Sequence, residues 1–303
     1  MNIVVVGPGA IGSLWAYHLH QAGHRVSLWH HTPSQSGLYP LSLCTLAEDT
    51  LPTIDFTTND TEALKTADLL LVTVKAWQLE PALLPLIQHL HPDTIIVCMQ
   101  NGMGATDSVY EKIQHFPLVL ATTTHGAFKT DAQQVCHSGL GQTMLGAANL
   151  SGEQCTFLAE VFNHALSEVL WVADIRGPLW NKLAINCVIN PLTAIHQCPN
   201  GTLAEEQFRP TIKALLSEIV AVMRAEGMTT SEEELSARVA QVITATKANH
   251  SSMKQDIAQQ RRTEIDFITG YLIQQAQQHH IAVPNNLRLF EQIKQMEQLW
   301  IQA

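Results

Sequence analysis

A lysine and two asparagines recur at four-residue spacing within an apolar segment. Lys182, Asn186 and Asn190 lie in residues 179–191, and residues four apart share one face of a helix. Asparagine is a poor helix former, so two in mid-helix need a reason. One interpretation is a lysine that reaches out to solvent, with asparagines that make structural hydrogen bonds. The other is a catalytic ammonium flanked by two amide ligands. The spacing leaves both interpretations open.

A second set of polar residues follows the same spacing in a predicted helix over residues 252–279. These residues are Ser252, Asp256, Gln260 and Glu264. Each step of four drifts by about 40° around a helix, so the set cannot point in one direction. Glu264 also lies among charged residues at 261–266. Periodicity alone therefore favours a solvated face over a functional carboxylate.

A glycine-rich motif near the start of the chain is typical of dinucleotide binding. A strand predicted over residues 2–6, a helix over 10–22 and a second strand over 25–29 give the motif its required context. In such a motif the first glycine permits a tight turn, the second admits a pyrophosphate, and the third permits close packing of helix on strand. The helix N-terminus offers free N–H groups to the phosphates. The motif is Gly7-Pro8-Gly9-Ala10-Ile11-Gly12.

The end of the second predicted strand bears on which dinucleotide binds. NAD enzymes usually carry Asp or Glu there, and an Arg nearby accommodates the 2′-phosphate of NADP. Residues 29–34 contain neither a carboxylate nor an arginine. We expect His30 or His31, with the hydroxyls of Thr32 and Ser34, to take the place of the arginine. The sequence therefore favours NADP(H) as the cofactor.

Two further polar residues follow buried strands predicted over 69–74 and 94–99. They are Lys75 and Asn101. The carboxyl ends of parallel strands are where ligands of this fold bind. A surface lysine and an ordinary turn are the alternatives, and position alone does not choose between them.

The remaining pattern predicts two domains. A further strand at 118–124 and an antiparallel hairpin over 134–146 complete a mainly parallel sheet covered on both faces. From about residue 178 helical patterns replace the strands. The predicted fold is an α/β Rossmann-type dinucleotide-binding domain at 1–172 and an all-α domain at 173–303. The helices of the second domain are expected at 178–190, 202–226, 231–248, 252–279 and 285–301.

Composition narrows the class of protein. A net charge of −10 argues against nucleic acid as a partner. We find no apolar run of about 18 residues that would span a membrane and no basic leader before the first strand. These features favour a cytoplasmic protein. The six cysteines form no CxxC pair and the fifteen histidines are scattered, so we expect reduced thiols and no metal site.

The sequence resembles those of the ketopantoate reductase family over nearly the whole chain. The likeness lies in the glycine motif, in residues 74–78, 101–104 and 180–194, and in residues 251–257 and 263–266. It implies NADPH-dependent reduction of the ketone of 2-dehydropantoate to (R)-pantoate, on the way to pantothenate and coenzyme A. The family's general acid matches Lys182, and an active-site carboxylate near the nicotinamide ribose matches Glu264. Its substrate ligands match Asn186, Asn190, Asn200 and Ser252.

The resemblance also assigns cofactor contacts to Lys75 and Ala127, and it puts Asn101 near both nicotinamide and substrate. One departure is His31, where some relatives carry an arginine. The expected partner is a small 2-oxo acid, and the protein is expected to be a monomer or a homodimer. Two alternatives remain: a reductase of a related 2-oxo acid, such as an opine-type dehydrogenase, and a non-catalytic NADP-sensing protein.

Overall fold

The structure is a computed structural model that describes residues 1–31 and 36–301. The predicted roles of Thr32 and Ser34 therefore fall outside the described residues. The chain forms two compact units. The first contains Met1–Gln100 and Ala105–Ile175, and the second contains Asn101–Gly104 and everything from Arg176 onward. The tetrapeptide that follows the predicted strand 94–99 thus belongs with the helical unit.

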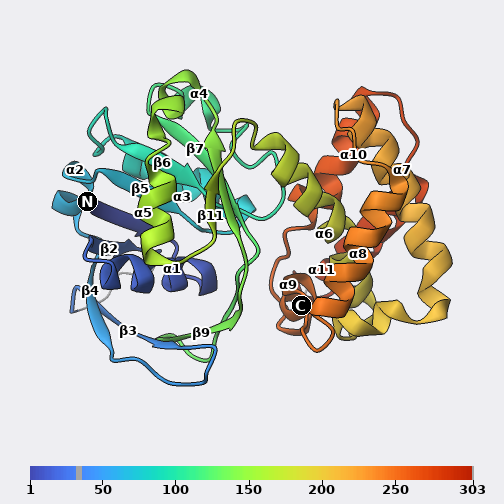
Figure 1. Cartoon of the computed structure of the whole chain (residues 1–303), viewed down its shortest axis with the longest axis horizontal. Coiled ribbons are helices and arrows are strands. Elements are labelled where there is room, and N and C mark those ends of the chain that lie inside the picture. Colours follow the sequence, from blue (N-terminus) through green and yellow to red (C-terminus); the bar gives the residue numbers. More distant parts are fainter. Residues whose placement is uncertain (32–35, 302–303) are drawn as a thin grey trace. The chain divides into compact units, whose positions relative to one another are not determined.

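The first unit is built on a mostly parallel sheet (Figure 1). Among the described residues the strand order is β11-β10-β7-β6-β5-β1-β2-β4-β3-β9-β8. The central strands β1, β5 and β6 are buried along almost their whole length, as expected for parallel strands covered on both faces. The bounds are β1 (Asn2–Val6), β2 (Arg25–Trp29), β3 (Leu38–Cys44), β4 (Ile54–Thr58), β5 (Leu69–Val72), β6 (Ile95–Cys98), β7 (Leu118–Thr123), β8 (Gly126–Lys129), β9 (Gln134–Gly139), β10 (Thr143–Ala147) and β11 (Val169–Trp171).

The predicted hairpin over 134–146 is wrong. Its two halves are β9 and β10, but β9 pairs with β8 and β3, whereas β10 pairs with β7 and β11. The true hairpin joins β7 and β8 to β9 and β10 and is bent at its middle. Gly141 lies at this bend, where a Cβ would come within 2.2 Å of the His125 backbone nitrogen. The glycines mark the bend, and each half pairs with a preceding strand rather than with the other half.

The bent hairpin brings β8 and β9 against α1 (Ala10–Gln21), the helix that begins in the glycine motif. In Figure 1, β3 and β9 curve past this helix. Trp15 and Tyr17 of α1 are fully buried in the resulting core. The other helical segments of this unit are α2 (Thr61–Lys65), η1 (Ala76–Gln78), α3 (Leu79–Ile87), α4 (Tyr110–Ile113), η2 (Leu150–Cys155) and α5 (Leu158–Ala165).

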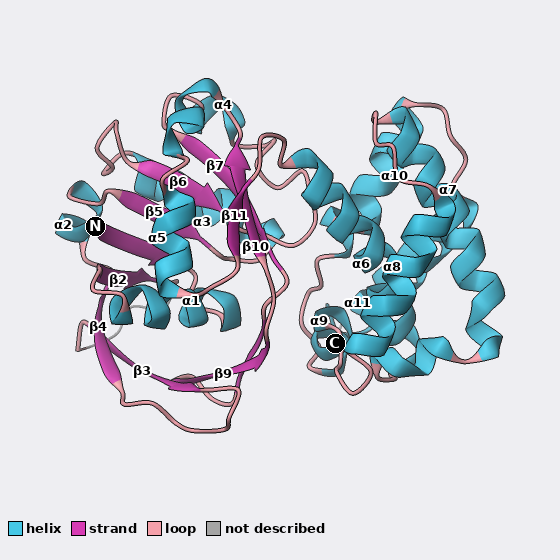
Figure 2. Cartoon of the chain, in the orientation of Figure 1, coloured by secondary structure: helices cyan, strands magenta, loops and turns pink. Residues whose placement is uncertain are grey.

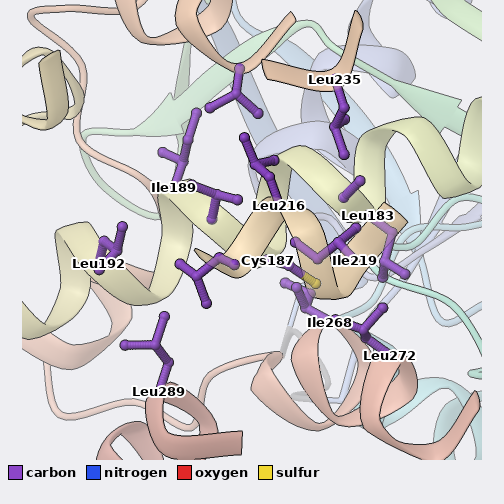
Figure 3. Close-up of a cluster of buried hydrophobic side chains, with 14 of the residues drawn as sticks. Leu183, Cys187, Ile189, Leu192, Leu216, Ile219, Leu235, Ile268, Leu272 and Leu289 are labelled. Atoms are coloured by element: carbon purple, nitrogen blue, oxygen red, sulfur yellow. The ribbon is translucent and has the colours of Figure 1, made fainter. Parts of the chain in front are cut away.

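The second unit contains helices joined by loops and has no strand among its described residues (Figure 2). Its longest helix, α6 (Arg176–His196), packs against α7, α8, α9 and α11. Figure 3 shows apolar side chains of α6, among them Leu183 and Cys187, within the buried core of this unit. The remaining elements are η3 (Asn200–Ala204), η4 (Glu206–Phe208), α7 (Arg209–Ala225), α8 (Glu232–Ala245), α9 (Ser252–Ala258), η5 (Ile265–Phe267), α10 (Thr269–Gln278) and α11 (Pro284–Ile301).

Two helix predictions are corrected. The helix expected over 252–279 is two helices, α9 and α10, separated by a turn that contains Glu264. Gln260 has a φ of 53°, which a helix cannot continue through. The helix expected over 178–190 instead runs through Pro191 to His196. Within it, the hydroxyl of Thr193 donates to the carbonyls of Ile189 and Asn190 at 2.7 and 3.1 Å.

A search of the helices in the described part of the chain finds none with the length and hydropathy needed to cross a membrane.

Candidate active site

Three polar side chains meet within the second unit and form a hydrogen-bonded chain. The Lys182 ammonium donates to Asn101 Oδ1 at 2.8 Å. The amide nitrogen of Asn101 donates to Glu264 Oε2 at 3.2 Å. Asn101 thus uses both ends of its amide, one for a cation and one for an anion. Sequence analysis named all three residues but did not predict that they contact one another.

The position of Lys182 on α6 changes its acidity. The segment around it is apolar, with Leu183 and Ala184 fully buried, and the lysine itself is partly buried. Burial lowers the pKa of Lys182 from 10.5 to about 8, while the Glu264 carboxylate acts in the opposite direction. A lysine of this pKa is still mostly protonated at neutral pH but gives up its proton more readily than an ordinary lysine.

Glu264 is held by the turn between α9 and α10. Its side chain is buried, which costs free energy unless the carboxylate is hydrogen-bonded. The preceding backbone N–H, that of Thr263, donates to Glu297 Oε1 of α11 at 2.7 Å. Glu297 is itself 2% exposed and pairs with Lys294 at 3.2 Å. These contacts fix the turn that presents Glu264 to Asn101.

Asn101 is held in place by the two residues that follow it. Gly102 has a φ of 83°, and a Cβ there would lie 2.2 Å from the Phe267 carbonyl oxygen. The next residue, Met103, donates its N–H to that same carbonyl at 2.9 Å. Only glycine permits this approach, so the structure requires glycine at position 102, which the sequence motif alone did not show.

The predicted substrate ligands lie on three elements of the second unit. Asn186 and Asn190 are on α6, one and two turns beyond Lys182, and Asn190 is buried. Asn200 begins η3, and its amide nitrogen donates to Thr246 Oγ1 at 3.0 Å. Its buried Oδ1 has no hydrogen-bond partner among the described residues. Ser252 is exposed at the start of α9.

The glycine motif has the geometry of a dinucleotide loop. Gly7 has a φ of 82°, and its N–H donates to Trp29 O at 2.8 Å. A Cβ on Gly12 would lie 2.4 Å from the carbonyl oxygen of Gly7, so α1 packs directly on the loop. A Cβ on Gly9 would meet nothing closer than 4.0 Å, and no described side chain caps the helix that begins there. The open space and the uncapped N–H groups fit a pyrophosphate.

The other predicted cofactor contacts lie in the first unit, and two of them follow the carboxyl ends of strands. Lys75 follows β5 and is partly buried at the start of η1. Ala127 lies on β8, beside an irregularity in its pairing with β9. His31 follows β2 and is exposed. Asn101 belongs to the second unit, whereas these residues belong to the first.

Glu297 is a functional candidate that sequence analysis missed. A signal for it existed in α11, where Leu289, Ile293 and Glu297 are spaced by four and all three are buried. An acid on the apolar face of an amphipathic helix requires a buried partner. No group of three or more His, Cys, Asp or Glu side chains arranged to hold a metal ion occurs in the described part of the chain.

Comparison with known proteins gives consistent matches along the chain. Residues 3–149 match the family described as "Ketopantoate reductase PanE/ApbA", and residues 174–297 match "Ketopantoate reductase PanE/ApbA C terminal". A curated 2-dehydropantoate 2-reductase from Vibrio cholerae is 52% identical over 303 residues, which is 100% of both chains. One from Escherichia coli O157:H7 is 43% identical, covering 98% of this chain and 95% of its own.

A solved structure supports the same grouping at the level of fold. The ketopantoate reductase of the PanE/ApbA family from Ralstonia eutropha JMP134 superposes with a TM-score of 0.86. It is 26% identical, and the match covers 98% of each chain. The predicted Rossmann unit and helical unit are therefore confirmed as the fold class.

Proposed function

The chain belongs to the ketopantoate reductase family, and we propose that it reduces 2-dehydropantoate to (R)-pantoate with NADPH. This reaction would contribute to the formation of pantothenate and coenzyme A. The substrate, a small 2-oxo acid, carries a negative charge. The net charge of the protein is also negative, so the site itself must supply positive charge. The observation that carries the proposal is the hydrogen-bonded chain of Lys182, Asn101 and Glu264.

In this proposal Lys182 is the general acid. NADPH, when bound, supplies a hydride to the ketone carbon. The Lys182 ammonium lies against the developing alkoxide, stabilises its negative charge and donates a proton to its oxygen. Asn101 Oδ1 accepts a hydrogen bond from the ammonium and so orients the lysine.

Glu264 has a separate part in the proposal. Its negative charge raises the pKa of Lys182 against the effect of burial. It therefore favours the protonated lysine at neutral pH, and Asn101 forms hydrogen bonds with both the ammonium and the carboxylate. We also propose that Glu264 contacts the nicotinamide ribose, because a buried carboxylate can accept hydrogen bonds from hydroxyl groups.

The amide and hydroxyl groups are proposed to bind the substrate. Asn186, Asn190 and Ser252 can donate hydrogen bonds to a carboxylate or hydroxyl without adding charge. Asn200 has a buried oxygen without a partner among the described residues, and such an oxygen can accept a hydrogen bond from a substrate hydroxyl. Residues 7–12 with Lys75, His31 and Ala127 are proposed to bind the cofactor.

The test is NADPH oxidation by the purified protein with 2-dehydropantoate, repeated with NADH and with a panel of 2-oxo acids. We expect kcat/KM to be highest for 2-dehydropantoate with NADPH. Lys182→Ala should lower kcat by about 10²- to 10⁴-fold, the usual contribution of general acid catalysis, while NADP+ binding persists. Lys213→Ala removes an exposed lysine of α7 from the same unit and should retain full activity.

Three results would contradict the proposal. A higher kcat/KM for another 2-oxo acid would change the substrate and keep the reaction class. NADP+ binding without any oxidation of NADPH by a 2-oxo acid would favour a sensing protein. Near-normal turnover by the Lys182→Ala variant would exclude this lysine as the acid.

A further inference from the structure

A lysine of the first unit lies on the glycine motif without a carboxylate partner. Lys129, at the end of β8, donates to Pro8 O at 3.2 Å, to the Tyr39 hydroxyl at 2.5 Å and to Ala132 O at 2.8 Å. Its ammonium is also 5.2 Å from the centroid of the Tyr39 ring. Every one of these partners is uncharged. The nearby Asp131 instead accepts a hydrogen bond from Gln133 N at 2.7 Å.

Lys129 is partly buried, and its position is fixed by the bent hairpin. β8 packs against α1, so the ammonium reaches Pro8, the second residue of the glycine motif. A half-buried cation usually pairs with an acid. Here, within the described residues, neutral groups hold the ammonium and leave its charge uncompensated.

The Lys129 ammonium also lies near the carboxyl end of β2. Gly7 N donates to Trp29 O, which brings the end of β2 beside the glycine motif. The His30 ring packs edge-on against Tyr39, with 5.4 Å between centroids. Desolvation, with smaller contributions from the charges of His31 and Lys129, lowers the pKa of His30. Three basic groups therefore gather here in a protein whose net charge is −10.

In Rossmann folds the end of the second strand meets the adenosine ribose, and the residue there selects between a 2′-hydroxyl and a 2′-phosphate. Residues 29–31 offer neither an acid nor an arginine. We infer that Lys129, which reaches this point from β8, supplies the positive charge that binds the 2′-phosphate of NADP(H). His30 Nε2 is buried and has no partner among the described residues, so it is a second donor for the same phosphate. This inference rests on the proposed use of NADPH.

A direct test measures binding rather than turnover. Apo protein is titrated with NADP+, NAD+ and 2′-AMP, and the dissociation constants are obtained by calorimetry. Lys129→Met should weaken NADP+ and 2′-AMP at least tenfold and NAD+ less than twofold. The loss should shrink at high salt, because screening weakens a charge-dependent contact at a partly exposed site. Lys65→Met, which removes an exposed lysine of α2, is the matched control and should change none of these constants.

The outcomes separate this inference from the proposed function. If wild-type protein prefers NADP+ and Lys129→Met keeps that preference, the inference is wrong and the proposed function stands. An equal loss of NADP+ and NAD+ shows a structural role and also overturns the inference. If wild-type protein has no preference for NADP+, the proposed use of NADPH fails as well. Should Lys129→Met not fold, Tyr39→Phe removes a hydroxyl that holds the ammonium, and it must weaken NADP+ more than NAD+.

Discussion

The rate of the proposed reaction should fall at a pH well below that at which an ordinary lysine loses its proton. Burial lowers the pKa of Lys182 to about 8, and only the protonated amine can donate a proton. With this pKa about 90% of the lysine is protonated at pH 7, about 10% at pH 9 and about 1% at pH 10. A lysine with the ordinary value of 10.5 would still be about 97% protonated at pH 9. We therefore expect kcat/KM to fall about tenfold per pH unit above pH 8.

The assay is the initial rate of NADPH oxidation at low 2-dehydropantoate between pH 6 and pH 10.5. Circular dichroism over the same range establishes that the protein stays folded. Glu264→Gln should move the decline to lower pH, because the carboxylate that raises the pKa of Lys182 is then absent. The residual rate of Lys182→Ala should lack the decline. If wild-type kcat/KM stays flat to pH 10, Lys182 is not the acid or is not desolvated in the active enzyme.

Three further changes have expected outcomes. Gly9→Ala should weaken NADP+ binding at least tenfold and leave the melting temperature unchanged, because the new methyl group meets no protein atom closer than 4.0 Å and occupies the space proposed for the pyrophosphate. Lys182→Met should raise the free energy of unfolding by up to about 3 kcal/mol at pH 7. The pKa of Lys182 is lower in the folded state than in the unfolded state, so the wild-type protein becomes more stable as the pH rises from 8 to 10.5. The stability advantage of the Lys182→Met variant should therefore disappear over this range, which denaturant titrations would measure. Glu297→Ala should lower kcat and shift the alkaline decline to lower pH, whereas Glu297→Gln, which keeps an acceptor for Thr263 N, should do neither.

The fold could be predicted wherever local signals and long-range pairing agree. The first strand, helix and second strand were expected at 2–6, 10–22 and 25–29, and they occur at 2–6, 10–21 and 25–29. The fingerprint requires this succession, so the motif and the fold support each other. The hairpin at 134–146 failed because its halves do not pair with each other: β9 pairs with β8 and β10 with β7, the two strands that precede them. Nothing within β9 shows that its parallel neighbour is β3, about 90 residues earlier.

For the candidate site, the sequence identified residue types and left their contacts open. The spacing of Lys182, Asn186 and Asn190 follows from helical geometry, and α6 carries all three. The same spacing suggested a continuous helix through Glu264, but the helix ends at Ala258 and a turn carries the carboxylate. The partner of that turn, Glu297, is more than thirty residues away, so no local pattern joined the two.

Asn101 belongs to the helical unit because the residues that follow it contact that unit. In sequence this residue follows β6 of the Rossmann unit, yet residues 101–104 pack with the helical unit through Gly102 and Met103. The hydrogen-bonded chain from Lys182 through Asn101 to Glu264 is therefore complete within one compact unit. A proton donor that is already oriented needs no rearrangement when charge develops on the substrate, and such preorganisation is the main source of electrostatic catalysis. In the proposed reaction the close approach at Gly102 would therefore matter for catalysis, because it fixes the amide that orients the ammonium.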